Sequence, residues 1–335
     1  MDNNVFTSYP IEERSYISFI KREVHNLVKH SFSETKTAEI DIIVSELTSN
    51  IIKHASKGEL LYKLQKTEAG SVFEVICVDN GPGIKDVAHA MQDGVSTTGT
   101  LGQGLGAIER LSSLFQLYSQ TGWGTIAYSK VTTISQPTEL DERVVIRALL
   151  VCKPGESVCG DGYGIRKDAA SSYIFLGDGL GHGEHAHEAS KQGTRYFLQT
   201  ADKDPIAILK GMHTELKKTR GLVGTVAVLN HESRKWQIFG IGNIATRINQ
   251  GMMIKNYTPY NGIVGLNIPN TTTATEIEKE KYQYLIMCSD GIKTKWDMSK
   301  YPYILKHDPI VLAAAIYKDH SRRTDDMSVL VAKVL

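Results

Sequence analysis

The composition of the chain changes near residue 132, and this change constrains the fold more than any other feature. Before it, two helical patterns and two glycine clusters surround a short run of β-forming residues. Residues 132–143 are polar, contain Pro137 and carry several acids, which is typical of a linker. The 335 residues suit two ordinary domains. We therefore expect a first domain at 1–131, a linker at 132–143 and a second domain at 144–335.

Composition and charge exclude several classes of protein. With 41% apolar and 22% charged residues, the chain is globular and can bury two cores. A net charge of +1 provides no field that favours nucleic acid. No window reaches the ~18 apolar residues of a membrane helix, and residues 1–14 lack a signal-peptide pattern. We expect a cytoplasmic protein that binds neither nucleic acid nor membranes.

The cysteines point to neither a disulfide framework nor a zinc site. They are scattered, and three lie in apolar, strand-like runs. We therefore expect buried, reduced thiols at all four positions. The positions are Cys77, Cys152, Cys159 and Cys288.

Hydrophobic periodicity places the regular elements. The first part is expected to hold helices at 12–30, 33–55 and 107–117 and strands at 72–78 and 122–131. The second part is expected to hold strands at 144–152, 172–177, 225–230, 235–240, 284–289 and 327–334 and helices at 184–198, 205–218 and 309–319. This order of strands, helices and strands indicates an α+β sandwich.

Three motifs in the first part suit nucleotide chemistry. Glu46 and Asn50 share one face of a helix, where an amide can bind Mg²⁺ and a carboxylate can accept a proton. Asp79-Asn-Gly-Pro-Gly ends a strand, and its glycines allow close approach of a base. Gly99–Gly106 precedes a helix whose N-terminus suits phosphate, although it lacks the lysine of a Walker A loop. Singly, each motif is weak evidence, because solvated helix faces and tight turns commonly have the same residues.

Together, the three motifs resemble the GHKL (Bergerat-fold) ATPases, in particular the small serine kinases that act as anti-sigma factors or stressosome switch kinases. The resemblance covers roughly residues 10–131 and implies an α/β sandwich that binds ATP and Mg²⁺. The implied roles are Glu46 as base, Asn50 as magnesium ligand, Asp79, Gly81 and Gly83 around adenine, Gly102, Gly104 and Gly106 as lid and phosphate contact, and Thr125 beside the adenine pocket.

Aspartates at the ends of strands mark the second part. Asp161, Asp178 and Asp290 are each followed by glycine, and Asp325-Asp326 precede the last strand. A single Asp-Gly pair is an ordinary turn. Distant carboxylates that converge at sheet ends can instead bind two hard cations, which activate water and hold a phosphate oxygen.

This order of aspartates resembles the protein phosphatase 2C superfamily, in its bacterial SpoIIE-like branch, over residues 144–335. The resemblance implies an α-β-β-α sandwich that holds two Mn²⁺ or Mg²⁺ ions. The implied metal ligands are Asp161, Asp178, the Gly179 carbonyl, Asp290 and Asp325, with Asp326 the less favoured member of its pair. Glycine instead of an acid precedes Asp161, and Arg147 is a loose candidate for phosphate binding.

Three histidines near Asp178 allow two interpretations. His182 lies in the phosphatase motif and suits a general acid for the leaving oxygen. His185 and His187 are expected to face solvent at a helix start. The spacing of the three does not match a standard structural zinc site, so zinc is the less favoured interpretation.

The two resemblances together imply a bifunctional partner-switching regulator. Its partners would be STAS-domain proteins, in a pathway that includes a sigma factor or a stressosome component. The alternative is that only the phosphatase is catalytic and the N-terminal domain is a nucleotide-gated, anti-sigma-like binding module. The oligomeric state stays open, with a dimer as one option.

Overall fold

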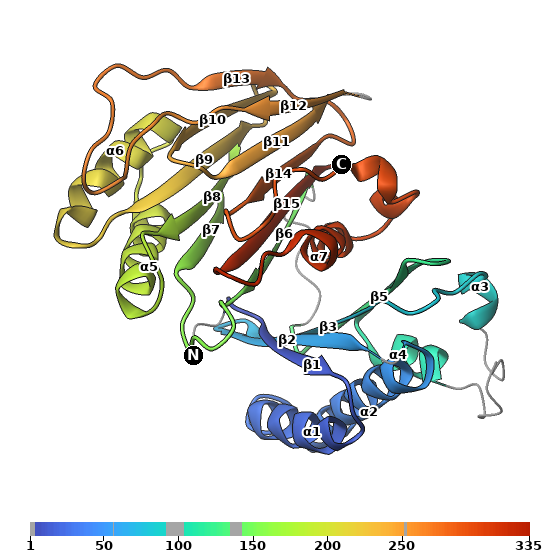
Figure 1. Ribbon diagram of the computed structural model, residues 1–335. Coiled ribbons are helices and arrows are strands. Elements are labelled where there is room, and N and C mark those ends of the chain that lie inside the picture. The colour runs from blue at the N-terminus through green and yellow to red at the C-terminus, as the bar shows by residue number, and fades with distance from the viewer. Residues whose placement is uncertain (1–3, 56, 92–103, 135–142, 251–252) are drawn as a thin grey trace. The chain divides into compact units, whose positions relative to one another are not determined.

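The computed structural model describes residues 4–55, 57–91, 104–134, 143–250 and 253–335 (Figure 1). Apart from these gaps, the chain forms two compact units. The first spans Asp2–Leu140 and Tyr301–Ala315, and the second spans Asp141–Lys300 and Ile316–Leu335. None of the described helices is long and apolar enough to cross a membrane.

The first unit is a sheet covered by helices. Its five antiparallel strands have the order β1-β2-β3-β5-β4. In chain order the elements are β1 (Thr7–Ile11), α1 (Ser15–Val28), α2 (Glu34–Asn50), the π-helix η1 (Ile51–Ala55), β2 (Gly58–Thr67), β3 (Gly70–Asp79), α3 (Val87–Ala90), α4 (Gly104–Leu111), β4 (Leu114–Gln120) and β5 (Gly124–Thr132).

One face of this sheet packs against α1, α2 and α4. Every second residue of β3 points to the helices, and Phe73 and Val75 are fully buried there. The helices supply their apolar faces, for example Val24 of α1 and Ile43 of α2. Ser33 caps α2 by accepting a hydrogen bond from the backbone N–H of Lys36. The core therefore fixes the end of β3 beside the C-terminal end of α2.

The second unit is built on two five-stranded sheets, β13-β10-β9-β8-β7 and β12-β11-β14-β15-β6. Its strands are β6 (Val144–Val151), β7 (Asp161–Lys167), β8 (Ser171–Gly179), β9 (Leu222–Asn230), β10 (Lys235–Ile241), β11 (Ala245–Gln250), β12 (Met253–Tyr257), β13 (Thr275–Glu278), β14 (Tyr284–Cys288) and β15 (Met327–Val334). Its helices are α5 (Glu184–Gln199), α6 (Pro205–Glu215), η2 (Leu216–Lys218) and η3 (Met298–Lys300). Two later elements, η4 (Ile304–Lys306) and the first part of α7 (Pro309–His320), fall in the segment Tyr301–Ala315 of the first unit.

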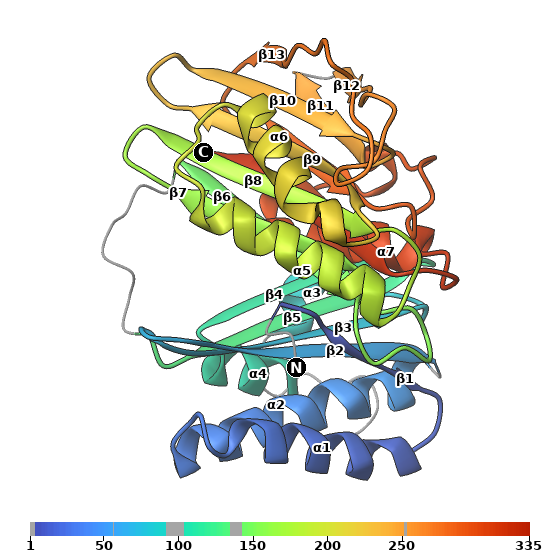
Figure 2. The ribbon, with the colours of Figure 1, turned by 90° about the vertical axis from the view of Figure 1, so that its left-hand side faces the viewer.

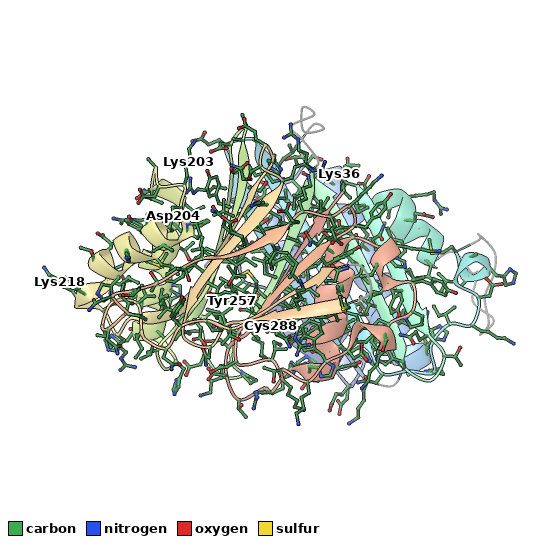
Figure 3. All side chains as sticks on the ribbon, turned by 90° about the horizontal axis from the view of Figure 1, so that it is seen from above. Lys36, Lys203, Asp204, Lys218, Tyr257 and Cys288 are labelled. Carbon is green, nitrogen blue, oxygen red and sulfur yellow. The ribbon has the colours of Figure 1, made fainter. Side chains whose placement is uncertain are left out.

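The main core of this unit lies between the two sheets. Residues of β8 and β9 meet residues of β14 and β15 there, with Trp236 of β10 among them. On the outer face of the first sheet, Phe197 of α5 and Met212 of α6 pack against Phe175 of β8 (Figure 2). Asp204, labelled in Figure 3, caps α6 by accepting a hydrogen bond from Ala207 N–H. This layering brings the C-terminal end of β8 beside the start of α5.

Candidate active sites

The expected adenine motif is tied to a distant threonine by its aspartate. Asp79 ends β3, and its Oδ1 accepts hydrogen bonds from the backbone N–H of Gly81 at 2.8 Å and of Thr125 at 3.2 Å. Two motifs that are 46 residues apart along the chain therefore meet at one carboxylate. Charge-assisted hydrogen bonds of this kind fix the orientation of the carboxyl group.

A serine that the sequence did not single out organises the same turn. The Ser119 hydroxyl accepts a hydrogen bond from Ile84 N–H at 2.7 Å and donates to the Gly124 carbonyl at 2.9 Å. It also lies 3.0 Å from the hydroxyl of Thr125. Ser119 thus joins the segment after the adenine motif to the β4–β5 turn. Its position on a strand was hidden in the sequence, because the first part of β4, up to Leu117, was predicted as the end of a helix.

Glycine is required at two positions of this site. Gly83 has φ +74°, and a Cβ there would lie 1.9 Å from the Gln120 carbonyl oxygen. Gly124 has φ +122°, and a Cβ there would lie 2.1 Å from the Asp79 carbonyl oxygen. Both are contacts that no side chain can adopt without a backbone shift. The close approach of β4, β5 and the Asp79 turn therefore depends on these residues.

Glu46 and Asn50 lie at the C-terminal end of α2, where both are partly exposed. A Cβ on Gly104, the first residue of α4, would lie 2.7 Å from Glu46 Oε2. The carboxylate thus lies against the start of the helix that follows the second glycine cluster. The backbone after Asn50 continues as the π-helix η1, a distortion that is frequent at functional sites. Gly106 is buried in α4, and Gly102 lies outside the described residues.

In the second unit, Asp161 and Asp178 lie directly opposite each other on β7 and β8. Asp161 is only 2% exposed. Its Oδ2 accepts hydrogen bonds from the hydroxyls of Ser289 at 2.7 Å and Ser328 at 2.5 Å. Its Oδ1 is buried and has no hydrogen-bond partner within the described residues. A buried carboxylate oxygen without a donor is the position that a cation would satisfy.

The charges around this pair support the same conclusion. The pKa of Asp161 is raised to about 7. Burial is the largest cause, the hydroxyls of Ser328 and Ser289 oppose it, and Asp326 and Asp290 add to it. Burial raises the pKa of Asp178 to about 10, reinforced by repulsion from Asp161, Asp290, Asp325 and Asp326. Carboxylates that disfavour each other's ionisation are stabilised by a divalent cation. The donor set therefore fits hard metal ions.

The two adjacent acids before β15 have different surroundings. Asp326 is 3% exposed, and its two carboxylate oxygens accept the N–H groups of Lys153 and Gly160, each at 2.7 Å. Asp325 is partly exposed, and its Oδ1 accepts only a local hydrogen bond from Asp326 N–H among the bonds recorded for the described residues. Asp326 therefore holds the β6–β7 connection in place. No such bond joins Asp325 to the β6–β7 connection within the described residues.

Asp290 follows β14 and is exposed, with its Oδ2 accepting a hydrogen bond from Asn243 Nδ2 at 3.2 Å. Gly179 ends β8, and a Cβ there would lie 2.1 Å from the Ala186 carbonyl oxygen. Among the described residues, no three of the aspartates bring their carboxylate oxygens within 4.8 Å of one another. The set is therefore gathered at one end of the two sheets without forming a tight cluster.

The histidines near Asp178 have separate surroundings. His182 is exposed, and its Nδ1 lies 2.8 Å from Glu156 Oε1. His185 is exposed in the first turn of α5, as expected. The prediction for His187 was wrong, because this residue is half-buried and its Nδ1 lies 2.9 Å from the Cys159 carbonyl oxygen. Arg147 lies in the middle of the β6–β15 ladder, opposite Val331, and not at the end that carries Asp325.

Comparison with known proteins identifies the first unit. A family model described as the histidine kinase-like ATPase domain matches residues 13–127. The serine/threonine-protein kinase RsbT of Bacillus subtilis is 38% identical over 94 residues, which are 28% of this chain and 71% of RsbT. The chain belongs to the histidine kinase-like ATPase family. Glu46, Asp79 and Thr125 all lie within residues 13–127, which the family model matches.

Two further relatives are phosphatase-type proteins. The phosphoserine phosphatase RsbX of Bacillus subtilis is 26% identical over 106 residues, 32% of this chain and 53% of RsbX. Stage II sporulation protein E of Priestia megaterium is 26% identical over 204 residues, 54% of this chain and 35% of that protein. The chain thus spans about half the length of RsbX and about a third of the length of stage II sporulation protein E. A kinase-like part is joined to a phosphatase-like part, as the sequence indicated.

Solved structures confirm the α+β class. RsbX in complex with magnesium aligns with a TM-score of 0.52 at 19% identity, over 66% of this chain and all of that chain. A structure described under the bacterial stressosome, as a modular system adapted to control secondary messenger signalling, aligns with a TM-score of 0.53 at 24% identity. That alignment covers 56% of this chain and 98% of the other. At these identities the likeness concerns the fold.

Proposed function

We propose that this ATPase-family chain is a bifunctional regulator that both phosphorylates and dephosphorylates serine or threonine on STAS-type proteins. The observation that carries the proposal is the Asp161–Asp178 pair. Asp161 Oδ1 is buried without a hydrogen-bond partner among the described residues, and burial and neighbouring aspartates raise the pKa of both carboxyls, which fits a divalent cation. The names of RsbT and RsbX, a kinase and a phosphoserine phosphatase, support the two opposed activities. The domains are proposed at 1–131 and 144–335, on either side of a 132–143 linker.

In the phosphatase domain, two Mn²⁺ or Mg²⁺ ions would be held by Asp161, Asp178, the Gly179 carbonyl, Asp290 and Asp325. Bound divalent ions lower the pKa of a water nucleophile and neutralise charge on the phosphoryl oxygens. The remaining roles belong to the surrounding side chains. Ser289 and Ser328 hold the Asp161 carboxylate, and Asn243 orients Asp290 by its amide hydrogen bond.

His182 is the proposed proton donor to the leaving serine or threonine oxygen. Glu156 accepts a hydrogen bond from its Nδ1 at 2.8 Å, which leaves Nε2 to face the substrate. The imidazole is 56% exposed, so the phosphorylated side chain of a folded protein can reach it.

In the kinase domain, Asp79 is the proposed acceptor for the adenine amino group, with Gly81, Gly83 and Thr125 around the base. The start of α4, with Gly102, Gly104 and Gly106, is the proposed phosphate contact. Asn50 would bind the Mg²⁺ that accompanies ATP. The Glu46 carboxylate lies against Gly104, at the start of α4. In this position it is the proposed acceptor of the proton of an attacking hydroxyl.

Replacement of Asp178, a proposed metal ligand, tests the phosphatase. Release of phosphate from a phosphoserine-bearing STAS protein in Mn²⁺ should disappear in Asp178→Asn, because the amide cannot supply the charge that a divalent ion needs. Asp202→Asn is the matched control, since Asp202 is an exposed acid of the same unit that lies outside the site. Release retained in Asp178→Asn at the wild-type rate would refute the metal assignment.

Replacement of the proposed base tests the kinase. With ATP and Mg²⁺, the wild-type protein should transfer phosphate to the STAS protein, whereas Glu46→Gln should bind ATP but lose transfer by about 10²–10⁴-fold. ATP binding by the wild type without any transfer would instead favour the nucleotide-gated binding module.

A further inference from the structure

Two cysteines and an aspartate that the proposed function does not use come together beside the phosphatase site. Cys152 follows β6, Cys159 precedes β7, and Asp326 precedes β15. One donor atom from each, the two Sγ atoms and a carboxylate oxygen, all lie within 4.8 Å of one another. Within the described residues, this is the single group of three His, Cys, Asp or Glu donors with such spacing. The expectation of buried thiols holds for Cys159 but not for Cys152, which is partly exposed.

The three donors are held in place by the backbone around them. The carboxylate of Asp326 accepts N–H groups from Lys153 and Gly160, which are the neighbours of the two cysteines. The Cys159 carbonyl oxygen lies 2.9 Å from His187 Nδ1 on α5. Cys159 is 1% exposed, whereas Cys152 borders the solvent. The group is therefore fixed on its inner side and open on its outer side.

The chemistry of these donors differs from that of the aspartate site. Thiolate sulfur prefers soft or borderline ions of the zinc class, whereas carboxylates without sulfur prefer Mg²⁺ and Mn²⁺. In a tetrahedral site with Zn–S bonds of about 2.3 Å, two sulfurs lie roughly 3.8 Å apart, which is compatible with the observed spacing. Three protein ligands with water as the fourth form the open type of zinc site.

We propose that Cys152, Cys159 and Asp326 bind one divalent ion of the zinc class, separate from the metal ions of the phosphatase centre. Binding replaces the two thiol protons, which are released to solvent, by two metal–sulfur bonds, and no oxidant is involved. The ion joins the ends of β6, β7 and β15. It thereby fixes the connection that carries Glu156, the partner of His182, and that leads into Asp161.

Cobalt is a suitable probe because Co²⁺ in a thiolate site absorbs through sulfur-to-metal charge transfer, whereas Co²⁺ among carboxylates does not. The full-length protein, stripped with a chelator and kept reduced, is titrated with Co²⁺ and then with Zn²⁺. The charge-transfer band should saturate at one equivalent of sulfur-bound cobalt and disappear as zinc displaces it. This absorbance does not depend on phosphatase or kinase activity. The metal-binding proposal can therefore fail while the proposed function holds, and the proposed function can fail while the metal-binding proposal holds.

Single substitutions locate the site. Cys152→Ser should lose the band, with affinity at least ~100-fold weaker, since even the loss of outer-shell partners costs about 10–100-fold. Cys77→Ala, at a buried cysteine of the first unit, should keep it. Circular dichroism checks that both variants fold. On the wild type, bound Zn²⁺ should also slow alkylation of Cys152, a measurement that needs no variant.

Three results would overturn the proposal. The first is a wild-type titration without a charge-transfer band, and the second is a band that persists in Cys152→Ser. The third is an intact mass lower by two hydrogens, with a Cys152–Cys159 peptide cross-link and no bound ion, which would assign the pair to a disulfide.

Discussion

The raised pKa of Asp178 makes a prediction about stability as well as about activity. In the folded protein this carboxyl keeps its proton up to about pH 10, whereas an unfolded aspartate releases it near pH ~3.9. The folded state therefore binds more protons between these two pH values. The free energy of unfolding then falls as the pH rises through that window, because ionisation is disfavoured only in the folded state. The stability contributed by the neutral carboxyl is complete below pH ~3.9 and is lost progressively above it.

The size of the effect follows from the shift. Between pH ~3.9 and 7.5, a single group loses up to ~5 kcal/mol, at about 1.36 kcal/mol per pH unit. Asp161 titrates in the same range and shares the repulsion, so the gain on neutralising Asp178 alone should be smaller, about 1–3 kcal/mol. For a domain of this size that corresponds to roughly 2–12 °C in Tm.

The perturbation is Asp178→Asn, measured by thermal unfolding in chelator at pH 7.5. We expect the variant to be more stable than the wild type, because the wild-type carboxyl must take up a proton on folding at pH 7.5, whereas the amide is neutral in both states. At pH 4 the difference should shrink, since the carboxyl of the unfolded wild type is then also largely protonated. The unfolding transition of the second unit can be identified in the wild type, because it is the one whose Tm Mn²⁺ changes. A variant that is as stable as the wild type or less stable at pH 7.5, with Asp202→Asn unchanged, would refute the reasoning.

Three further predictions follow from individual contacts. Ser328→Ala removes the 2.5 Å hydrogen bond from the Ser328 hydroxyl to Asp161. It should raise the Mn²⁺ concentration for half-maximal phosphatase activity by about 10–100-fold, and an unchanged Mn²⁺ activation curve would contradict this prediction. Gly83→Ala places a methyl group 1.9 Å from a carbonyl oxygen and should abolish ATP binding in a fluorescent-nucleotide titration, with wild-type affinity as the contrary result. His182→Asn should lower the kcat of the phosphatase by about 10²–10⁴-fold and leave its activation by Mn²⁺ unchanged. Glu156→Gln, which changes the partner of His182, should lower kcat less. A wild-type kcat in both variants would exclude His182 as the proton donor.

Strands with strong apolar patterns were predictable, and strands formed by pairing alone were not. The last strand was predicted at 327–334 and is β15, Met327–Val334. By contrast, β7 has the sequence Asp-Gly-Tyr-Gly-Ile-Arg-Lys, in which only Tyr163 and Ile165 are apolar. Two alternating positions among glycines and charges are too few to predict a strand, and its conformation depends on pairing with β8. The helix expected at 107–117 ends at Leu111, because the residues from Leu114 pair with β5. Helical periodicity there was overridden by tertiary pairing.

The site shows the same division between local and tertiary information. The aspartates were found because each acid is followed by glycine or another acid, which is a local pattern. Their supporting residues were missed, since only the folded sheets show that Ser289 and Ser328 both donate to Asp161. Ser289 precedes Asp290 directly, in Ser-Asp-Gly, and Ser328 lies two residues after Asp326, in Asp-Asp-Met-Ser, so a signal was present. Asn243 and Glu156 had no such signal, because neither neighbours a motif in the sequence.

The pairing of opposed activities in one chain can be tested by a single measurement of phosphate turnover on one STAS-domain protein. The protein is labelled from radioactive γ-phosphate ATP with Mg²⁺, and the label is then followed after addition of Mn²⁺ and removal of ATP. The account predicts that the wild type adds the label and then releases it, that Asp178→Asn adds it and retains it, and that Glu46→Gln never adds it. A wild-type protein that binds ATP and Mn²⁺ yet neither adds nor releases phosphate would contradict the central claim.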